Sequence, residues 1–155
     1  MSALARTSSD TYIFMAGDTC HFPGTFRPSH QLKLPNIIPP SVTMKPGLPT
    51  PTSSSCFTCF HPCPSKASST PFYEVSQAKG GWYVDPPKAQ TSVTSLQEFD
   101  GDENVLVLIA HDPALLHVMD LFPSHSLNTW QEKGWKEKLA WNFLIELPSR
   151  DTFAS

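Results

Sequence analysis

The sequence predicts an α/β protein, because apolar strands and proline-initiated helices follow one another along the chain. Two continuous runs of apolar residues, at 12–16 and 104–110, have the length and composition of strands buried on both faces. Asp-Pro pairs at 85–86 and 112–113 place a capping carboxylate before a proline suited to the first turn of a helix. A length of 155 residues fits one domain, so we expect a single α/β unit over 1–155.

The first strand is expected at 12–16, where the apolar run Tyr-Ile-Phe-Met-Ala is followed by Gly17 and Asp18. The glycine ends the run, so Asp18 would stand where the strand enters a loop. Strand ends in layered α/β folds hold ligands and metals on rigid supports. An aspartate after a strand is also a common turn residue, so Asp18 by itself does not identify a site.

The segment 25–71 is expected to be a long loop or an insertion. It contains ten of the sixteen prolines and a Thr-Ser-Ser-Ser run at 52–55. Prolines at this density prevent a continuous helix or strand, and the composition disfavours a packed conformation between about 31 and 69. The only local element we expect there is a short turn near 57–60.

The pattern becomes regular over 72–155, beginning with a helix capped by Asp85. Apolar residues at helical spacing give this helix one buried stripe, formed by Ala89, Val93 and Leu96. The stripe ends near Phe99, so the Asp-Gly-Asp sequence at 100–102 is expected to form the turn out of the helix.

The second strand is expected at 104–110 and ends directly at His111. A lone histidine is more often a satisfied polar side chain than a ligand, so His111 also needs further context. The Asp-Pro pair that follows it is expected to open a helix that reaches about Leu121.

The C-terminal segment is expected to be partly helical and to pack through tryptophans. Asn128 and Gln131 have the spacing of a capping box for a short helix, which Gly134 would end. Burial is the ordinary role of the three large aromatic residues in this segment, Trp130, Trp135 and Trp141. The mixed charges at 132–138 are expected on a solvated helical face.

Composition argues against several classes of function. The formal net charge is -3, and the few Lys and Arg residues are scattered, which disfavours nucleic-acid binding. The longest apolar stretch, at 105–110, is far short of the roughly 20 residues of a membrane span, so we expect no membrane partner. The N-terminus has no basic head followed by a long apolar run. We therefore expect a cytoplasmic location, where the four cysteines need not form disulfides.

Six segments form a more specific pattern together than any of them does alone. They are Leu4-Ala-Arg-Thr7, Tyr12-Ile-Phe-Met-Ala-Gly-Asp-Thr-Cys-His-Phe22, Gly24-Thr-Phe-Arg-Pro28, Gly81-Trp-Tyr-Val-Asp-Pro86, Val105-Leu-Val-Leu-Ile-Ala-His-Asp112 and Leu127-Asn-Thr-Trp-Gln-Glu-Lys-Gly-Trp-Lys-Glu-Lys138. This combination resembles a branch of the metallo-β-lactamase-fold hydrolases over nearly the whole chain. The resemblance implies an αββα sandwich, of which this chain would be the C-terminal half with a long Pro/Ser-rich loop.

The resemblance also implies a metal site and a hydrolytic function. In the family, the Gly-Asp aspartate bridges two metal ions and the Ala-His-Asp histidine binds the second one. Asp18 and His111 are the matching positions in this sequence. The implied cofactor is zinc or another divalent metal, and the implied activity is hydrolysis of a thioester, lactone or related acyl bond in a small-molecule substrate.

Other ligands of the family are missing from this sequence. They come from a His-x-His-x-Asp-His motif and from a further histidine, and 4–7 resembles the segment that directly follows that histidine. A catalytic zinc usually has three protein ligands, whereas Asp18 and His111 are two, and His21 matches no ligand position on which the family depends. We therefore expect an incomplete metal site and little or no activity in this chain.

A second set of potential metal ligands lies in the proline-rich loop. Cys56, Cys59, His61 and Cys63 are soft ligands of the type that zinc accepts, although structural sites usually pair two separated knuckles. The alternative function is therefore a non-enzymatic binding or scaffold protein, or a small zinc module built on this loop. Cys20 lies close to Asp18 and would be reactive only if it were exposed.

Overall fold

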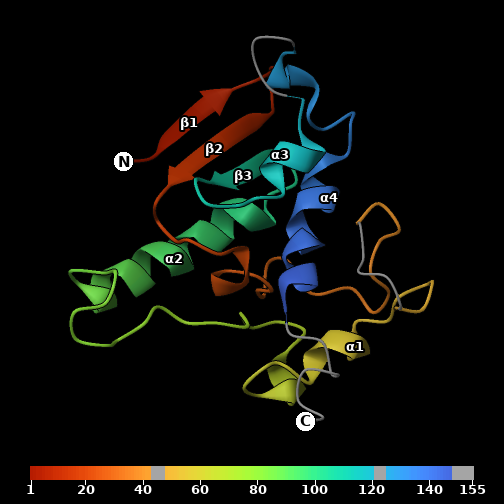
Figure 1. The fold of residues 1–155 in the computed structure, drawn as a ribbon. Helices are drawn as coiled ribbons and strands as arrows, with labels where there is room; N and C mark the ends of the chain where they lie inside the picture. The colour runs from red at the N-terminus through yellow and green to blue at the C-terminus, as the bar shows by residue number, and fades with distance from the viewer. Residues whose placement is uncertain (43–47, 121–124, 148–155) are drawn as a thin grey trace.

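The computed structural model describes residues 1–42, 48–120 and 125–147. It is a mixed α/β fold with a three-stranded sheet, as the alternation of strand and helix signals predicts (Figure 1). The strands are β1 (Ala3–Arg6), β2 (Tyr12–Gly17) and β3 (Val105–Ile109). The helices are α1 (Ser55–Thr58), α2 (Pro86–Gly101), α3 (Leu115–Val118) and α4 (Trp135–Asn142), with 3-10 turns at Pro23–Thr25, Pro64–Lys66, Leu127–Thr129 and Phe143–Glu146.

The sheet has the order β1–β2–β3, in which β1 is antiparallel to β2 and β2 is parallel to β3. Both strands predicted from apolar runs are confirmed, and Tyr12 is paired with Val105. Because β2 and β3 run in the same direction, their carboxyl ends lie at one edge of the sheet. The sequence did not predict β1, because its four residues are mostly exposed and form no apolar run of their own.

Helices cover both faces of the sheet and give the molecule three layers (Figure 1). On one face, Val93 and Leu96 of α2 are buried with Val105, Val107 and Ile109 of β3. On the other face, the buried core is formed by Ile13, Leu106, Ala114, Met119, Trp130, Trp135 and Leu139. The alternation of β3 side chains between these two cores explains why its sequence is apolar throughout.

The described residues of the proline-rich segment, 25–42 and 48–71, are packed, so the expectation of an unpacked conformation between 31 and 69 is wrong for them. Four of its apolar side chains, Leu34, Ile38, Val42 and Phe57, are buried in one core with residues of α4 and the turn after it. The other buried members of this core are Phe72, Ala140, Trp141, Phe143, Leu144 and Leu147. The backbone is also paired across the segment, because the Ile38 N–H donates to the Thr52 carbonyl at 2.9 Å. Prolines exclude long regular elements, but they do not prevent the apolar residues between them from being buried.

The packing of this segment makes a prediction for two adjacent isoleucines. Ile38 is 2% exposed and Ile37 is 49% exposed. We expect Ile38→Val to lower the free energy of unfolding by roughly 0.5–1.5 kcal/mol, because a buried methylene is lost and a small cavity remains. Ile37→Val removes the same group from a half-exposed side chain and should change stability by less than about 0.5 kcal/mol. Equal urea midpoints for the two variants would show that the segment does not pack in solution.

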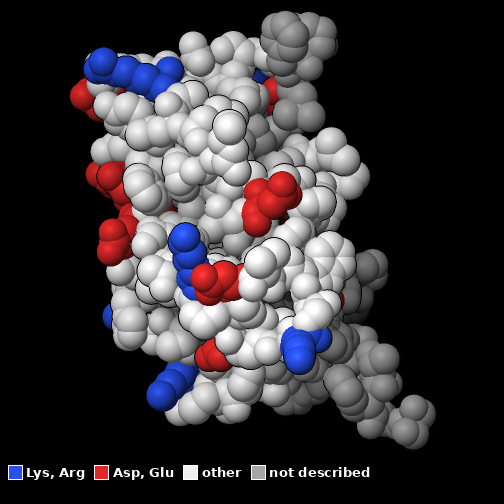
Figure 2. Space-filling model, turned by 90° about the vertical axis from the view of Figure 1, so that its left-hand side faces the viewer, with Lys and Arg blue, Asp and Glu red and all other residues white. Residues whose placement is uncertain are grey.

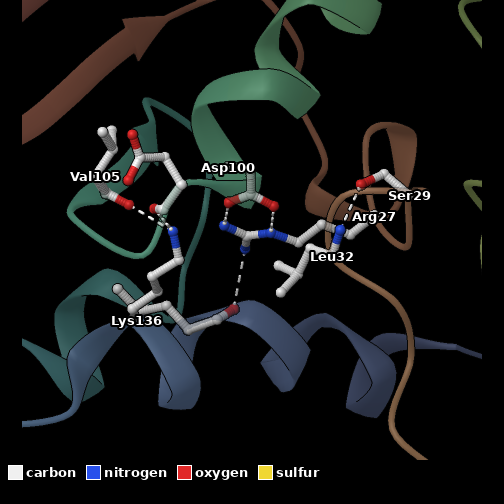
Figure 3. Close-up of polar contacts among 8 residues, drawn as sticks. Arg27, Ser29, Leu32, Asp100, Val105 and Lys136 are labelled. Carbon is white, nitrogen blue, oxygen red and sulfur yellow. Dashed lines mark hydrogen bonds and ion pairs between the residues drawn. The ribbon is translucent and has the colours of Figure 1, made fainter.

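A buried ion pair joins the loop after β2 to the C-terminal end of α2 (Figure 3). The Arg27 guanidinium donates to both carboxylate oxygens of Asp100, at 2.8 and 2.6 Å, and a third donor reaches the Leu139 carbonyl of α4 at 3.2 Å. Asp100 was expected in a turn, but α2 continues through Gly101 and the carboxylate lies inside the protein. The helix end was predicted at the point where the apolar stripe stops. The helix continues beyond that point, and its Asp100 carboxylate is paired with Arg27, which is distant in sequence.

Regular structure after β3 is shorter than predicted. α3 is a single turn, and Asp112 accepts a hydrogen bond from the Ala114 N–H at 2.9 Å instead of capping a long helix. The chain leaves the helical region at Met119, whose backbone is extended. The expected helix end near Leu121 lies outside the described residues.

The predicted capping box at Asn128 and Gln131 is wrong. The capping residue is Ser126, whose hydroxyl accepts from the Asn128 N–H at 3.2 Å. Gln131 instead donates from its side-chain amide to Asn104 Oδ1 at 3.4 Å. Gly134 ends this turn as expected, with a φ of 63° that favours glycine, and α4 begins at the next residue.

The tryptophans and charges of the C-terminal segment have separate roles. Trp130, Trp135 and Trp141 are buried, as predicted. The charged run between them is not wholly solvated, because the Lys136 ammonium donates to the carbonyls of Asp102 and Val105 at 2.5 and 2.6 Å (Figure 3). Lys136 therefore holds the beginning of β3 against α4.

The surface carries charges of both signs. On the face shown in Figure 2, acidic and basic side chains are dispersed over a largely uncharged surface. α2, with 16 residues, includes charged and polar positions along its length.

In the parts of the chain that the structure describes, no helix is long and apolar enough to cross a membrane.

Candidate metal centre

The parallel pairing of β2 and β3 brings two potential ligands to one edge of the sheet. Gly17 is paired with Ile109, and the Ala110 N–H donates to the Gly17 carbonyl at 3.0 Å. Asp18 follows the first of these strand ends and His111 follows the second. Gly17 has a φ of 57°, a backbone conformation that L side chains rarely adopt, which turns the chain away from the sheet directly before Asp18.

Asp18 and His111 are in direct contact. His111 Nε2 lies 3.0 Å from Asp18 Oδ1, which confirms the prediction that the two side chains converge. Two ligands of one zinc ion have donor atoms no more than about 4.2 Å apart, so the observed separation is within that limit. The His111 and Asp18 side chains are 55% and 70% exposed, so both are accessible to an ion from solvent.

His21 joins this pair, although it matches no ligand position on which the family depends. Among the described residues, one group of three His, Cys, Asp or Glu side chains has converging donor atoms, namely Asp18, His21 and His111, all within 4.8 Å. The His21 ring stacks on the His111 ring with centroids 4.8 Å apart. The signal that could have found His21 is the Asp-x-x-His spacing directly after a strand, where a tight turn returns the chain toward the same point.

A cavity of about 440 Å³ adjoins this group. His21 and His111 contribute to its lining together with Phe22, Val75, Trp82, Tyr83 and three polar residues. The Trp82 ring centroid is 5.1 Å from that of His21, and the Tyr83 hydroxyl lies 3.5 Å from His21 Nδ1. Two histidines with potential metal-binding atoms therefore line a mostly apolar cavity of the size that small molecules occupy.

The three side chains fit a divalent metal ion in type and nearly in spacing. Two imidazoles and a carboxylate are donors that zinc accepts. The widest separation, up to 4.8 Å, exceeds by about 0.6 Å the limit for two ligands of one zinc. Because Asp18 and His111 are largely exposed, small side-chain rotations can close this difference.

The alternative ligands in the proline-rich segment are not brought together. Cys59 and Cys63 are exposed, whereas His61 is buried. The His61 ring uses both nitrogens, because Nε2 donates to the Pro71 carbonyl at 2.9 Å and Nδ1 accepts from the Cys63 N–H at 2.9 Å. His61 thus holds two parts of the segment together and is unavailable to a metal in this conformation. Cys56, the fourth member, is half-buried and packs beside the apolar core of the segment.

Cys20 is a buried structural residue. Its side chain is 0% exposed and packs in the core beneath α2. Burial raises the pKa of the thiol to about 12, so the thiolate that a nucleophilic cysteine needs is scarcely formed at neutral pH. Cys20 therefore anchors the turn between Asp18 and His21 from the inside.

Comparison with known proteins identifies relatives that match most of the chain. The gamma-lactamase FDB1 of Fusarium pseudograminearum is 36% identical over 145 residues, which cover 92% of this chain and 34% of the lactamase. The metallo-hydrolase mfmC of Annulohypoxylon moriforme is 33% identical over 151 residues, which cover 92% of this chain and 36% of that protein. The names of these relatives support the metallo-β-lactamase-fold resemblance of the chain.

The chain spans about a third of the length of those two relatives. A third protein, the cytochrome P450 monooxygenase mpaDE of Penicillium roqueforti, is 32% identical over 155 residues, which cover 95% of this chain but 14% of that protein. That match concerns a small part of a much longer protein, so its name carries no argument for this segment. No protein-family model and no solved structure matches the chain.

Proposed function

We propose that this chain is the metal-binding part of a hydrolase that acts on a thioester, lactone or related acyl bond. The observation that carries the proposal is the contact between Asp18 and His111 at the carboxyl ends of two parallel strands. The names of the relatives, a gamma-lactamase and a metallo-hydrolase, support a metal-dependent hydrolase, and the lactam of the first name is an acyl bond related to those proposed. We propose that the three-layered unit forms half of an αββα sandwich.

A bound divalent ion would supply a Lewis acid and would lower the pKa of a coordinated water to roughly 7. Asp18 and His111 would hold the ion, and zinc is the ion we propose. The adjoining cavity would hold the acyl substrate, with Trp82 and Phe22 as apolar surface for the part of the substrate away from the reacting carbonyl. Glu74 also lines the cavity, and its carboxylate disfavours an anionic group beside it.

We expect the 155-residue chain itself to have little or no turnover. The sequence contains no His-x-His-x-Asp-His motif, from which the family resemblance derives most of the metal ligands. A centre that binds an ion without the rest of that set would lack the charge and positioning that stabilise the transition state. Metal binding and catalysis are therefore separate expectations for this chain.

The experiment that tests the proposal measures zinc stoichiometry and hydrolysis together. We expect the purified chain to bind one equivalent of zinc, and a Cys56→Ser/Cys59→Ser/Cys63→Ser variant to bind the same amount. With zinc present, neither a thioester nor a lactone should be hydrolysed above background. Loss of zinc in the triple variant would favour a zinc module in the loop and overturn the proposal, as would a chain that binds no zinc. Zinc-dependent turnover would support the hydrolase class and refute the expected inactivity.

A further inference from the structure

We propose that His21 is a third metal ligand, so that Asp18, His21 and His111 form a self-contained site for one divalent transition-metal ion. The inference rests on the proposed function and deepens it, because the family resemblance assigns only Asp18 and His111. It starts from the convergence of the three donor atoms within 4.8 Å. Three protein ligands with an open position are the pattern of a catalytic rather than a structural zinc site.

The fold holds His21 in place through the turn that precedes it. The Thr19 N–H and hydroxyl donate to the Ala16 carbonyl at 3.3 and 2.7 Å, which bends the chain directly after β2. The next residue, Cys20, is completely buried in the core beneath α2. With its neighbour anchored in this way, His21 is returned to the edge of the sheet that carries Asp18 and His111.

Aromatic side chains restrict the orientation of the His21 ring. Trp82 contacts it at a tilt of 59°, with centroids 5.1 Å apart, and Tyr83 meets it edge to face at 5.9 Å. The Tyr83 hydroxyl is also 3.5 Å from His21 Nδ1, a distance at the long end of a hydrogen bond. A hydrogen bond to the ring nitrogen that does not bind the metal orients a ligating imidazole and fixes its tautomer. Trp82 and Tyr83 are therefore positioning residues for the proposed ligand.

The donor set indicates the class of ion. Two imidazoles and one carboxylate favour borderline ions such as Zn²⁺, Co²⁺ and Ni²⁺ over Mg²⁺ and Ca²⁺, which prefer sites made of oxygen ligands. Because His21 and His111 also line the cavity, a small molecule in the cavity could occupy the open position. The site would therefore bind an ion that remains accessible to an exogenous ligand.

The test compares His21→Ala with the parent chain by calorimetric titration of zinc, in the background without Cys56, Cys59 and Cys63. We expect His21→Ala to lower zinc affinity by more than about 100-fold, because loss of a residue that only supports a ligand typically costs 10–100-fold. A His117→Gln variant is the matched control, because His117 is exposed and lies outside the converging group, and its affinity should not change. If His21→Ala unfolds the chain, as circular dichroism would show, His21→Gln is measured instead, with the same expectation.

Trp82 provides an independent readout at the site. It is 83% exposed, whereas the other three tryptophans, Trp130, Trp135 and Trp141, are at most 4% exposed. Co²⁺ bound beside the His21 ring should quench the fluorescence of Trp82, and Trp82→Phe should abolish that component. Zinc and Co²⁺ binding that is unchanged in His21→Ala but lost in His111→Ala would overturn the role of His21 and leave the proposed function intact. Absence of binding in the parent chain would instead refute the proposed function.

Discussion

Arg27→Met is expected to lower the free energy of unfolding by roughly 3–5 kcal/mol, because it leaves a buried charge without its partner. The side chains of Arg27 and Asp100 are 2% and 1% exposed, so water cannot solvate the remaining carboxylate. The substitution also removes the donor to the Leu139 carbonyl, and with it the link between α2 and α4. Urea unfolding followed by circular dichroism measures the loss.

Two further variants decide whether the effect comes from the uncompensated charge. Arg27→Met/Asp100→Leu removes both charges and should recover much of the lost stability, because a buried ion pair and an apolar pair of similar volume are often nearly equivalent. Lys133→Met breaks the exposed pair with Asp120 and should cost less than about 1 kcal/mol. An Arg27→Met variant as stable as Lys133→Met would show that the guanidinium does not hold these elements together.

His111→Ala is expected to weaken zinc binding by more than about 100-fold. Loss of a residue that only supports a ligand typically costs 10–100-fold in affinity, so loss of a direct donor should cost more. Asp18→Ala should have a comparable effect, because its carboxylate oxygen lies 3.0 Å from His111 Nε2 and would contribute the negative charge of the site. Competition with a chromophoric zinc chelator measures the affinities.

The same variants should lose stabilisation by zinc. At a zinc concentration about 100 times the dissociation constant, binding adds about 2.7 kcal/mol to the stability of the parent chain, and this increment should vanish in His111→Ala. Without zinc, His111→Ala should be nearly as stable as the parent, because the imidazole is 55% exposed. A variant that keeps the zinc-dependent rise in melting temperature would exclude His111 as a ligand.

Local sequence patterns were sufficient to predict the strands and the helix that position the site. The apolar runs predicted β2 and β3, and Asp85, whose side chain accepts from the Lys88 N–H at 3.1 Å, marks the beginning of α2. Capping, strand propensity and apolar periodicity depend on residues that are close in sequence, so they can be recognised without tertiary information. The meeting of Asp18 with His111 was expected from the family resemblance, and the parallel pairing of β2 with β3 brings it about, because adjacent parallel strands end at one edge of a sheet.

Two other features depended on partners that are distant in sequence. Arg27 and Asp100 are 73 positions apart, and neither residue lies in a sequence motif that predicts an ion pair. The composition of the proline-rich segment predicts a loop. Only its contacts with Trp141 and Phe143 show that its apolar residues form a core.

The sequence by itself determined that this chain has two apolar strands followed by Asp18 and His111, because β-strand formation and strand termination are encoded locally. The parallel pairing of these strands came from the tertiary structure. Only the tertiary structure decided that His21 completes a group of three donors and that Cys56, Cys59, His61 and Cys63 do not form one. The physical reason is that a metal site requires donor atoms within a few ångströms of each other, and proximity in sequence does not ensure that distance. Both ring nitrogens of His61, for example, are engaged by hydrogen bonds to the backbone, Nε2 with the carbonyls at 70–71 and Nδ1 with the Cys63 N–H.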